Sequence, residues 1–306
     1  EIEAFHVMDI LARARALEAQ GRDVVHMEIG EPDFPTPDAV IEAGIAALRA
    51  GFTHYTPSLG LPALRTAIAA NYPAGCRPDP ASVIVTPGSS GALVLAFGVL
   101  INPGDEVLMA DPGYPCNRHF VRMFEGRARL VPVGPDTGYQ LTAELIRRHW
   151  SPRTRAVLIS SPSNPTGTLV PDTELAAIVA AVRELGGVLI VDEIYHGLTY
   201  GVEAGTALRH APDVFVVNSF SKFYGMTGWR VGWLVAPPAY VDAIDRLAQN
   251  VFLATSTPGQ HAALAVFQPA VQAELERRRA EFEARRDVLL PALRGLGFRI
   301  PVVPSG

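Results

Sequence analysis

The sequence predicts an α/β fold, with a large domain whose mainly parallel sheet is covered by helices on both faces, plus a smaller α/β domain. Three observations predict it. The 306 residues leave room for two domains, 48% of them are hydrophobic, and short apolar runs alternate with longer helical patterns. The runs are apolar throughout, which is typical of strands buried on both faces. This composition excludes a disordered chain, a collagen and a coiled-coil rod.

Two helices are predicted at the start of the large domain. Thr36 and Pro37 are typical of an N-cap and a first helical position, so we expect a helix over 39–49 that Gly51 ends. A second helix is predicted over 61–71, where proline begins the pattern and another proline follows it.

Short, mostly β-branched runs bounded by turn residues are the predicted strands. Helical patterns such as 89–100 and 171–185 lie between them, and this alternation predicts a mainly parallel sheet. The predicted strands are 83–86, 106–110, 128–133, 156–160, 188–191, 214–217 and 231–236.

The C-terminal part reads as one long amphipathic helical stretch over 258–294, with the charged run 274–279 on its solvent face. Residues 300–306 read as a strand and turn. The large, cofactor-binding domain is assigned to residues 36–266, and the small domain to 1–35 and 267–306. Because the sequence stops inside the last predicted strand and opens at Glu1 rather than Met, we expect an incomplete small domain and a longer gene product.

Charge and cysteine content narrow the function classes. There are 26 basic and 31 acidic residues, and this net charge of −5 argues against a nucleic-acid partner. No apolar run is long enough to predict a membrane span, and no metal site is predicted. The two cysteines, Cys76 and Cys116, cannot make a disulfide framework, so we expect a cytoplasmic protein.

Lysine usage is the most informative count. All the basic residues except Lys222 are arginines. A GC-rich genome explains an excess of arginine, but it does not explain why one lysine remains. Arginine cannot replace lysine where a deprotonated amine must form an imine with a carbonyl group. Lys222 is therefore a candidate catalytic residue.

The neighbours of Lys222 favour a phosphate-bearing carbonyl cofactor. Lys222 follows the predicted strand 214–217, and open α/β sheets bind ligands at that edge. Ser219, Ser221 and Arg230 flank the lysine, and hydroxyls with a forked guanidinium suit a phosphate dianion. A phosphate anchor beside an imine-forming lysine indicates pyridoxal phosphate.

Other parts of such a site follow other predicted strands. Asp192 ends a strand and could pair with the pyridine nitrogen. Asn164 and Tyr195 could donate to the ring hydroxylate, and Tyr114 could form an aromatic lid. Each residue alone is explained at least as well as a turn, a cap or a core aromatic, but their conjunction at one sheet edge favours the cofactor site.

A phosphate cradle is predicted where the strand 83–86 joins the next helix. Residues 86–91 read Thr-Pro-Gly-Ser-Ser-Gly, and their backbone N–H groups could face an anion. Ser89 and Ser90 are its candidate side chains. The loop lacks the Gly-x-Gly-x-x-Gly spacing that a nicotinamide dehydrogenase would need.

These motifs together resemble the class I/II aminotransferases, the aspartate-aminotransferase-like fold type I of pyridoxal-phosphate enzymes. The resemblance runs from Gly-Glu-Pro-Asp-Phe at 30–34 to Pro-Ser-Gly at 304–306. It rests on Ser-x-Ser-Lys at 219–222 and Gly-x-Arg-x-Gly at 228–232, supported by Asn-Pro-x-Gly and Asp-x-x-Tyr.

The resemblance implies an enzyme that moves an amino group between an L-amino acid and a 2-oxo acid through an aldimine on Lys222. Lys222 would also shuttle the proton, with Asp192 on the pyridinium and Tyr195 on the ring oxygen as its catalytic partners. It implies cofactor binding by Lys222, Ser89, Ser90, Tyr114, Asn164, Asp192, Tyr195, Ser219, Ser221, Arg230 and Tyr55.

The resemblance also implies substrate contacts and a partner. Gly30 and Asn164 would lie near the substrate carboxylate. Tyr55 lies in a loop between two predicted helices, and it matches a residue that reaches the phosphate of the neighbouring subunit. We therefore expect a homodimer with shared active sites.

One departure from the family and several alternatives remain. Family members continue beyond the Pro-x-Gly at 304–306 with an arginine for the substrate carboxylate, and neither Arg294 nor Arg299 matches that motif. A β-lyase or decarboxylase would use the same cofactor set. A non-catalytic sensor domain of a transcription regulator would need a basic DNA-binding extension. The sequence does not identify the amino acid substrate.

Overall fold

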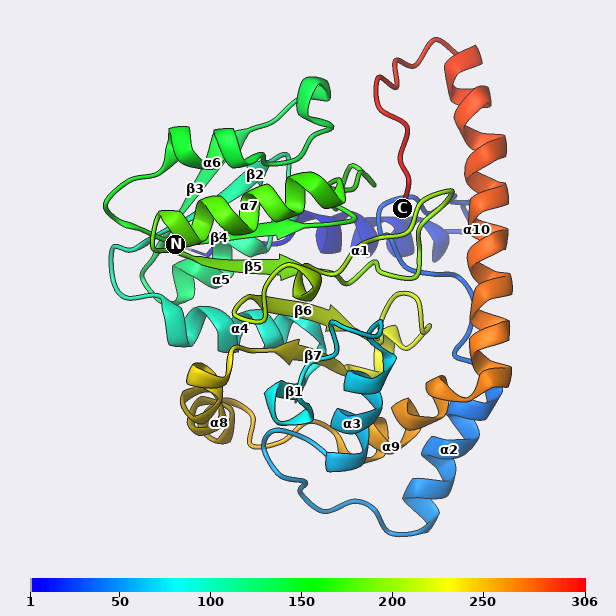
Figure 1. Cartoon of the computed structure of the whole chain (residues 1–306). Coiled ribbons are helices and arrows are strands. Elements are labelled where there is room, and N and C mark those ends of the chain that lie inside the picture. The colour runs from blue at the N-terminus through cyan, green and yellow to red at the C-terminus, as the bar shows by residue number, and fades with distance from the viewer. Residues whose placement is uncertain (1) are drawn as a thin grey trace.

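The computed structural model describes residues 2–306; Glu1, the predicted start of the small domain, lies outside them. Its centre is a seven-stranded sheet with the order β1-β7-β6-β5-β4-β2-β3 (Figure 1). The strands are β1 Val83–Thr86, β2 Glu106–Asp111, β3 Arg127–Pro132, β4 Thr154–Ser160, β5 Val188–Asp192, β6 Phe215–Ser219 and β7 Gly232–Val235.

Most of the sheet is parallel, as predicted. Strands β3, β2, β4, β5 and β6 pair in parallel, and β7 pairs antiparallel with both β6 and β1. The C-terminal ends of β2, β4, β5 and β6 therefore lie along one edge. β1 ends at this edge too, because two antiparallel pairings restore its direction.

Helices cover both faces of the sheet, which confirms the predicted layers. One buried apolar cluster packs α2, α3, α6, α7 and α9 on one face, and a second packs α4, α5 and α8 on the other. The helices are α1 His6–Glu18, α2 Asp38–Arg49, α3 Pro62–Asn71, α4 Gly88–Leu100, α5 Asn117–Met123, α6 Ala143–His149, α7 Asp172–Glu184, α8 Pro238–Val251, α9 Thr257–Leu264 and α10 Pro269–Gly295.

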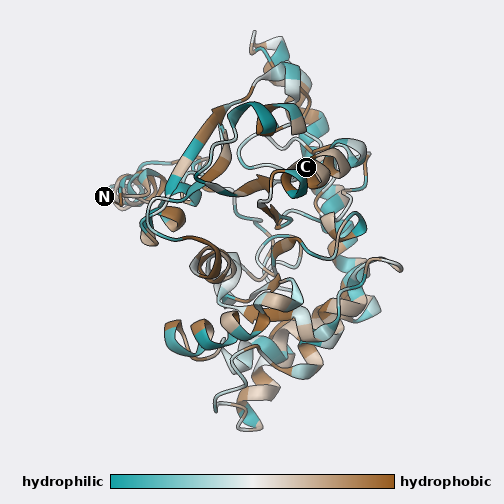
Figure 2. Cartoon of the chain, turned by 60° about the vertical axis from the view of Figure 1, so that its left-hand side comes forward, coloured by the Kyte–Doolittle hydropathy of each residue, from teal (hydrophilic) through white to brown (hydrophobic). Residues whose placement is uncertain are grey.

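Strand β6 shows how the two clusters share the sheet. Val216 belongs to the first cluster, whereas Phe215 and Val217 belong to the second, and all three are fully buried. Successive strand residues point to opposite faces, so a strand covered on both sides must be apolar at every position. Figure 2 shows the resulting concentration of hydrophobic residues on the central strands, with hydrophilic residues on the outer helices.

The predicted single helix over 258–294 is wrong. Helix α9 passes into a 3-10 turn over Ala265–Phe267, the chain is extended at Gln268, and α10 then begins at Pro269. Proline disfavours the helical conformation of the residue before it, so Gln268 cannot continue the helix. The predicted strand and turn over 300–306 are also wrong, because this tail has no regular secondary structure and runs back along α10 toward the sheet (Figure 1).

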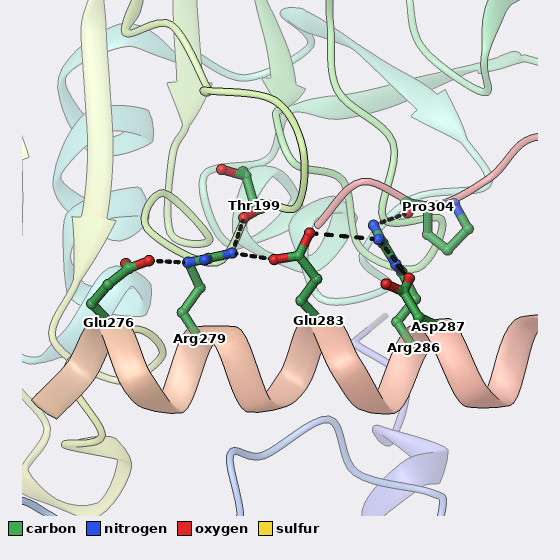
Figure 3. Close-up of polar contacts among 7 residues, drawn as sticks. All are labelled: Thr199, Glu276, Arg279, Glu283, Arg286, Asp287 and Pro304. Carbon is green, nitrogen blue, oxygen red and sulfur yellow. Dashed lines mark hydrogen bonds and ion pairs between the residues drawn. The ribbon is translucent and has the colours of Figure 1, made fainter.

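The expectation that residues 274–279 form a solvent face is wrong for two arginines of α10. The side chains of Arg278 and Arg279 are only 15% and 20% exposed. Arg279 pairs with Glu276 at 2.6 Å and with Glu283 at 2.8 Å, and it donates to the Thr199 carbonyl at 3.1 Å (Figure 3).

A further arginine of α10, Arg286, holds the C-terminal tail. Arg286 donates to the Pro304 carbonyl at 3.3 Å (Figure 3), and its guanidinium lies 4.9 Å from the centre of the Tyr200 ring. Charged residues of α10 therefore tie the tail and the loop after β5 to the helix. None of the helices in residues 2–306 is long and apolar enough to cross a membrane.

Candidate active site

The residues predicted to form the site follow neighbouring strand ends. Ser160, the last residue of β4, is paired with Asp192, the last residue of β5, and Asp192 is paired with Val217 of β6. Asn164 follows β4, and Lys222 follows β6. Because these strands are parallel and in register, their polar C-terminal extensions meet at one edge.

The Lys222 amine lies inside this edge, partly removed from solvent. Its Nζ donates to the Gly30 carbonyl at 2.6 Å and lies 5.7 Å from the centre of the Tyr195 ring. Burial lowers the pKa of the Lys222 amine, and the nearby Arg230 cation acts in the same direction. Both effects increase the share of free amine, which is the form that reacts with a carbonyl.

Asp192 is a buried carboxyl without a cationic partner. Its side chain is buried, its Oδ1 accepts a hydrogen bond from the Ile194 N–H at 3.0 Å, and it forms no ion pair within residues 2–306. Burial raises the pKa of the Asp192 carboxyl to about 7, and the neighbouring Glu193 adds to the rise. A protonated ring nitrogen is the kind of group that would relieve this cost.

Asn164 and Tyr195 are brought together as predicted. The Asn164 Nδ2 donates to the Tyr195 hydroxyl at 3.2 Å. Burial raises the pKa of Tyr195, and the bond from Asn164 partly opposes this rise. The Asn164 amide and the Tyr195 hydroxyl therefore lie side by side, and both can donate a hydrogen bond to the same ligand oxygen.

Tyr114 lies beside the same group. Its ring packs edge-to-face against Phe5, with ring centres 6.0 Å apart. Burial raises the pKa of the Tyr114 hydroxyl most, and Cys116, Tyr195 and Asp192 raise it further. Tyr114 and Asn164 also line a pocket of roughly 220 Å³ at this edge of the sheet.

The predicted phosphate cradle lies at the start of α4. The N-cap residue is Pro87, whose side chain has no acceptor for the N–H groups of the first turn, so these groups can face an anion. Gly88 has a φ of +70°, and a Cβ there would lie 2.5 Å from the Arg230 guanidinium. Only glycine leaves this space open, so the guanidinium lies directly over the helix N-terminus.

Two serines and the arginine complete the cradle. Ser219 and Ser221 are buried, and the Ser219 Oγ donates to the Ser221 Oγ at 2.9 Å. Arg230 adopts a left-handed backbone conformation, with φ +55°, and its Nη1 donates to the Thr227 carbonyl at 3.0 Å. The donors therefore suit a phosphate, and with Asp192 and Lys222 they fit pyridoxal phosphate.

Comparison with known proteins identifies the family. The model of the family described as aminotransferase class I and II matches residues 22–306. The chain belongs to the class I and II aminotransferase family. The predicted family, α/β fold and transaminase activity are confirmed.

Individual aminotransferases are similar over nearly the whole chain. The valine–pyruvate aminotransferase of Mycobacterium tuberculosis is 39% identical over 97% of this chain and 77% of its own length. The (5-formylfuran-3-yl)methyl phosphate transaminase of Methanocaldococcus jannaschii is 38% identical over 97% of this chain and 79% of its own. The solved aspartate aminotransferase of Thermus thermophilus with maleate has a TM-score of 0.96 and 35% identity, covering 100% of this chain and 81% of that one.

Of the remaining predicted residues of this aminotransferase, one reaches the site and one does not. Gly30 reaches the site, because its carbonyl accepts the hydrogen bond from Lys222. Tyr55 is 83% exposed, and it takes no part in the hydrogen bonds of the site within residues 2–306. Its role at a neighbouring subunit stays a prediction.

Sequence reasoning missed the anchoring of residues 30–36. Thr36 is not the N-cap of α2, a position that Pro37 takes. The Thr36 hydroxyl instead donates to the Gly225 carbonyl at 2.7 Å and accepts a hydrogen bond from the Trp229 Nε1 at 3.0 Å. Nor did the sequence indicate that the Thr227 hydroxyl donates to the Glu31 Oε1 at 2.5 Å.

Proposed function

We propose that this aminotransferase binds pyridoxal phosphate at the C-terminal edge of its sheet and exchanges amino groups between amino acids and 2-oxo acids. The observation that carries the proposal is the convergence of the only lysine, a buried unpaired carboxyl and a phosphate cradle at one edge. Structural reasons alone do not explain this convergence, because each group is costly or unnecessary there without a ligand.

Each group would hold one part of the cofactor. When bound, pyridoxal phosphate supplies an aldehyde that condenses with amines and a ring that withdraws electrons. Asp192 would keep the ring nitrogen protonated, Asn164 and Tyr195 would donate to the ring oxygen, and Tyr114 would cover the ring. The phosphate would be held by Ser89, Ser90, Ser219, Ser221 and Arg230.

Lys222 would also act as the base. Burial lowers the pKa of its Nζ and so favours the free amine, which is the form that can take the proton from the substrate α-carbon. Gly30 and Asn164 would contact the substrate carboxylate. The two curated relatives are named for different substrates, so we assign the class of α-amino acids and 2-oxo acids and no single compound.

The proposal predicts a single site of covalent labelling. Borohydride reduces an imine to a stable amine, and Lys222 is the only lysine that can form one. Reduction of the cofactor-loaded protein is therefore expected to leave a pyridoxyl group on one peptide, the one that contains Lys222. Peptide mass spectrometry measures this, with cofactor-free protein as the control. Label on another peptide, or none in a loaded sample, would contradict the assignment.

We further propose the domain division and the cytoplasmic location expected from the sequence. Residues 1–35 and 267–306 form the small domain, and 36–266 the large one. The division is supported by the ion pair between Asp33 and Arg285 of α10 at 2.9 Å, because it joins the two segments assigned to the small domain. The cytoplasm is supported by Cys76 and Cys116, which are both free thiols.

We also propose a homodimer in which Tyr55 reaches the phosphate of the other subunit. The support is its exposure of 83%, since a large exposed aromatic side chain with a polar tip suits an interface. A cofactor held by two chains would stabilise the dimer, because binding to the assembled form shifts the equilibrium toward it.

Tyr55→Phe is therefore expected to weaken cofactor binding and to lower the stability of the dimer. Loss of one hydrogen bond to a charged group predicts about a tenfold weaker affinity. Cofactor titration and analytical ultracentrifugation of the cofactor-free and loaded proteins measure both effects. Tyr240→Phe, on helix α8, is the matched control, because the Tyr240 ring packs on Phe215 of the sheet. A loaded protein that stays monomeric at micromolar concentration would exclude the shared site.

A further inference from the structure

Residues 30–36 form a strap between the loop that carries the catalytic lysine and α10. We call residues 30–36 the N-terminal strap and residues 222–230 the lysine loop. On the α10 side, Phe34 packs edge-to-face against Phe282 with ring centres 5.3 Å apart. The strap has no regular secondary structure, so side-chain contacts hold it in place.

On the other side, the strap touches the lysine loop at consecutive residues. The Gly30 carbonyl accepts from the Lys222 Nζ at 2.6 Å, and the Glu31 Oε1 accepts from the Thr227 hydroxyl at 2.5 Å. Glu31 is thus fixed by the same loop that presents the amine. This hydrogen bond restrains the Glu31 carboxylate relative to the lysine loop.

We propose that Glu31 is a positioning residue for Lys222, whose carboxylate, anchored on Thr227, biases the charge of the Lys222 amine. The proposal rests on the role of Lys222 proposed above, and it adds a residue that the sequence motifs did not indicate. Glu31 touches no reacting atom in this proposal, because it acts through the field at the Nζ.

The groups that face the amine come from several elements. Burial lowers the pKa of Lys222, and Glu31 is the charged group that opposes this most strongly. Arg230, at the end of the lysine loop, lowers that pKa, and Asp192 of β5 raises it. The Tyr195 ring lies 5.7 Å away and also favours the cation. Burial raises the pKa of Asp192 to about 7, so its own effect on the amine depends on pH.

This balance suits an amine that must release a proton and take one up. Burial and Arg230 both make the amine less basic, and a less basic amine is a weaker acceptor for a substrate proton. The Glu31 charge restores part of the basicity. Because Glu31 lies on the strap and the strap packs on α10, the charge of the amine depends on the strap staying in place.

The experiment uses the fact that Lys222 is the only lysine. Acetic anhydride reacts with free amines but not with ammonium groups, so the labelling of the Lys222 peptide against pH reports its protonation directly. The full-length protein freed of cofactor is labelled between pH 6 and 11. An anion stabilises the ammonium, so Glu31→Gln is expected to move the midpoint to lower pH by about one unit. In the loaded protein, the midpoint of the cofactor absorbance against pH should move in the same direction.

Matched variants separate this effect from a general loss of structure. Glu28→Gln removes a carboxylate that lies in the same N-terminal segment but pairs with His26 at 2.7 Å, and it is expected to leave the midpoint unchanged. Thr227→Val removes the anchor and should give a smaller shift to lower pH, while Thr227→Ser should restore the wild-type value.

The outcomes are distinct from those of the proposed function. Superimposable profiles for Glu31→Gln and the wild type would overturn the proposal, as would an equal shift in Glu28→Gln. If Glu31→Gln does not fold, the Thr227 pair decides, and identical midpoints for Thr227→Val and Thr227→Ser overturn the proposal. The cofactor-free labelling does not require that Lys222 bind pyridoxal phosphate, so a failure of the borohydride experiment leaves this test intact.

Discussion

Lys222→Ala is expected to reduce the turnover of amino acid by at least about four orders of magnitude, because it removes both the amine and the base. The 306 residues contain no second lysine that could take over. The substitution shortens a half-buried side chain whose one hydrogen bond within residues 2–306 is to the Gly30 carbonyl, so the fold should persist. Turnover with saturating amino acid and 2-oxo acid measures the effect, and circular dichroism checks the fold.

Lys222→Arg is the matched variant for this prediction. It keeps a positive charge near Tyr195 but offers a guanidinium that neither forms an imine nor loses a proton in this pH range. We expect it to be as inactive as Lys222→Ala. A small amine such as methylamine should restore part of the activity of the alanine variant and none of the arginine variant. Activity within tenfold of the wild type in either variant would exclude Lys222 as the catalytic amine.

Asp192→Asn is expected to lower turnover by about two to three orders of magnitude while the cofactor still binds. Asparagine has nearly the same shape and can keep the hydrogen bond from the Ile194 N–H. It cannot supply the negative charge that would keep the ring nitrogen protonated. Turnover and cofactor affinity are measured separately, so a loss of rate is distinguished from a loss of binding.

Asp213→Asn is the control for this substitution. Asp213 lies just before β6, is exposed and pairs with Arg183 at 2.6 Å, and we expect its variant to keep wild-type turnover. Unchanged turnover in Asp192→Asn would mean that another carboxylate holds the ring nitrogen.

The cofactor-free protein offers a second measurement on Asp192. Burial raises its pKa to about 7, so between about pH 4 and pH 7 the folded state retains a proton that the unfolded chain has lost. The free energy of unfolding should therefore decrease as the pH rises through this window. In Asp192→Asn this contribution is absent, and chemical denaturation at pH 5 and pH 8 measures the difference.

The sheet was predictable because its strands are buried on both faces. Residues 83–85, for example, are all apolar, and the ends of the observed strands differ from the predicted ends by at most two residues. The short helices α5 and α6 were missed, since seven residues make too few turns for a helical period to stand out. The break at Gln268 was missed because the apolar pattern continues on both sides of Pro269.

The site was predictable where its residues follow strands in the sequence. Asn164, Asp192 and Lys222 each lie at or just beyond a strand end, so the parallel sheet alone brings them together. The contact of Glu31 with Thr227 was not predictable, because 196 positions separate them and the strap has neither a period nor a cap. Tyr55 stays a prediction, since it concerns a second chain.

The pairing of β1 constrains how this chain folds during synthesis. Among the described strands, β1 pairs only with β7, and Val83 lies opposite Val235. About 150 further residues must therefore leave the ribosome after β1 before that edge of the sheet can form. Until then the apolar helix α4 lacks β7 and α8, two of its packing partners. Nascent chains stalled before β7 should expose this helix to chaperones, and chains stalled after α8 should bury it.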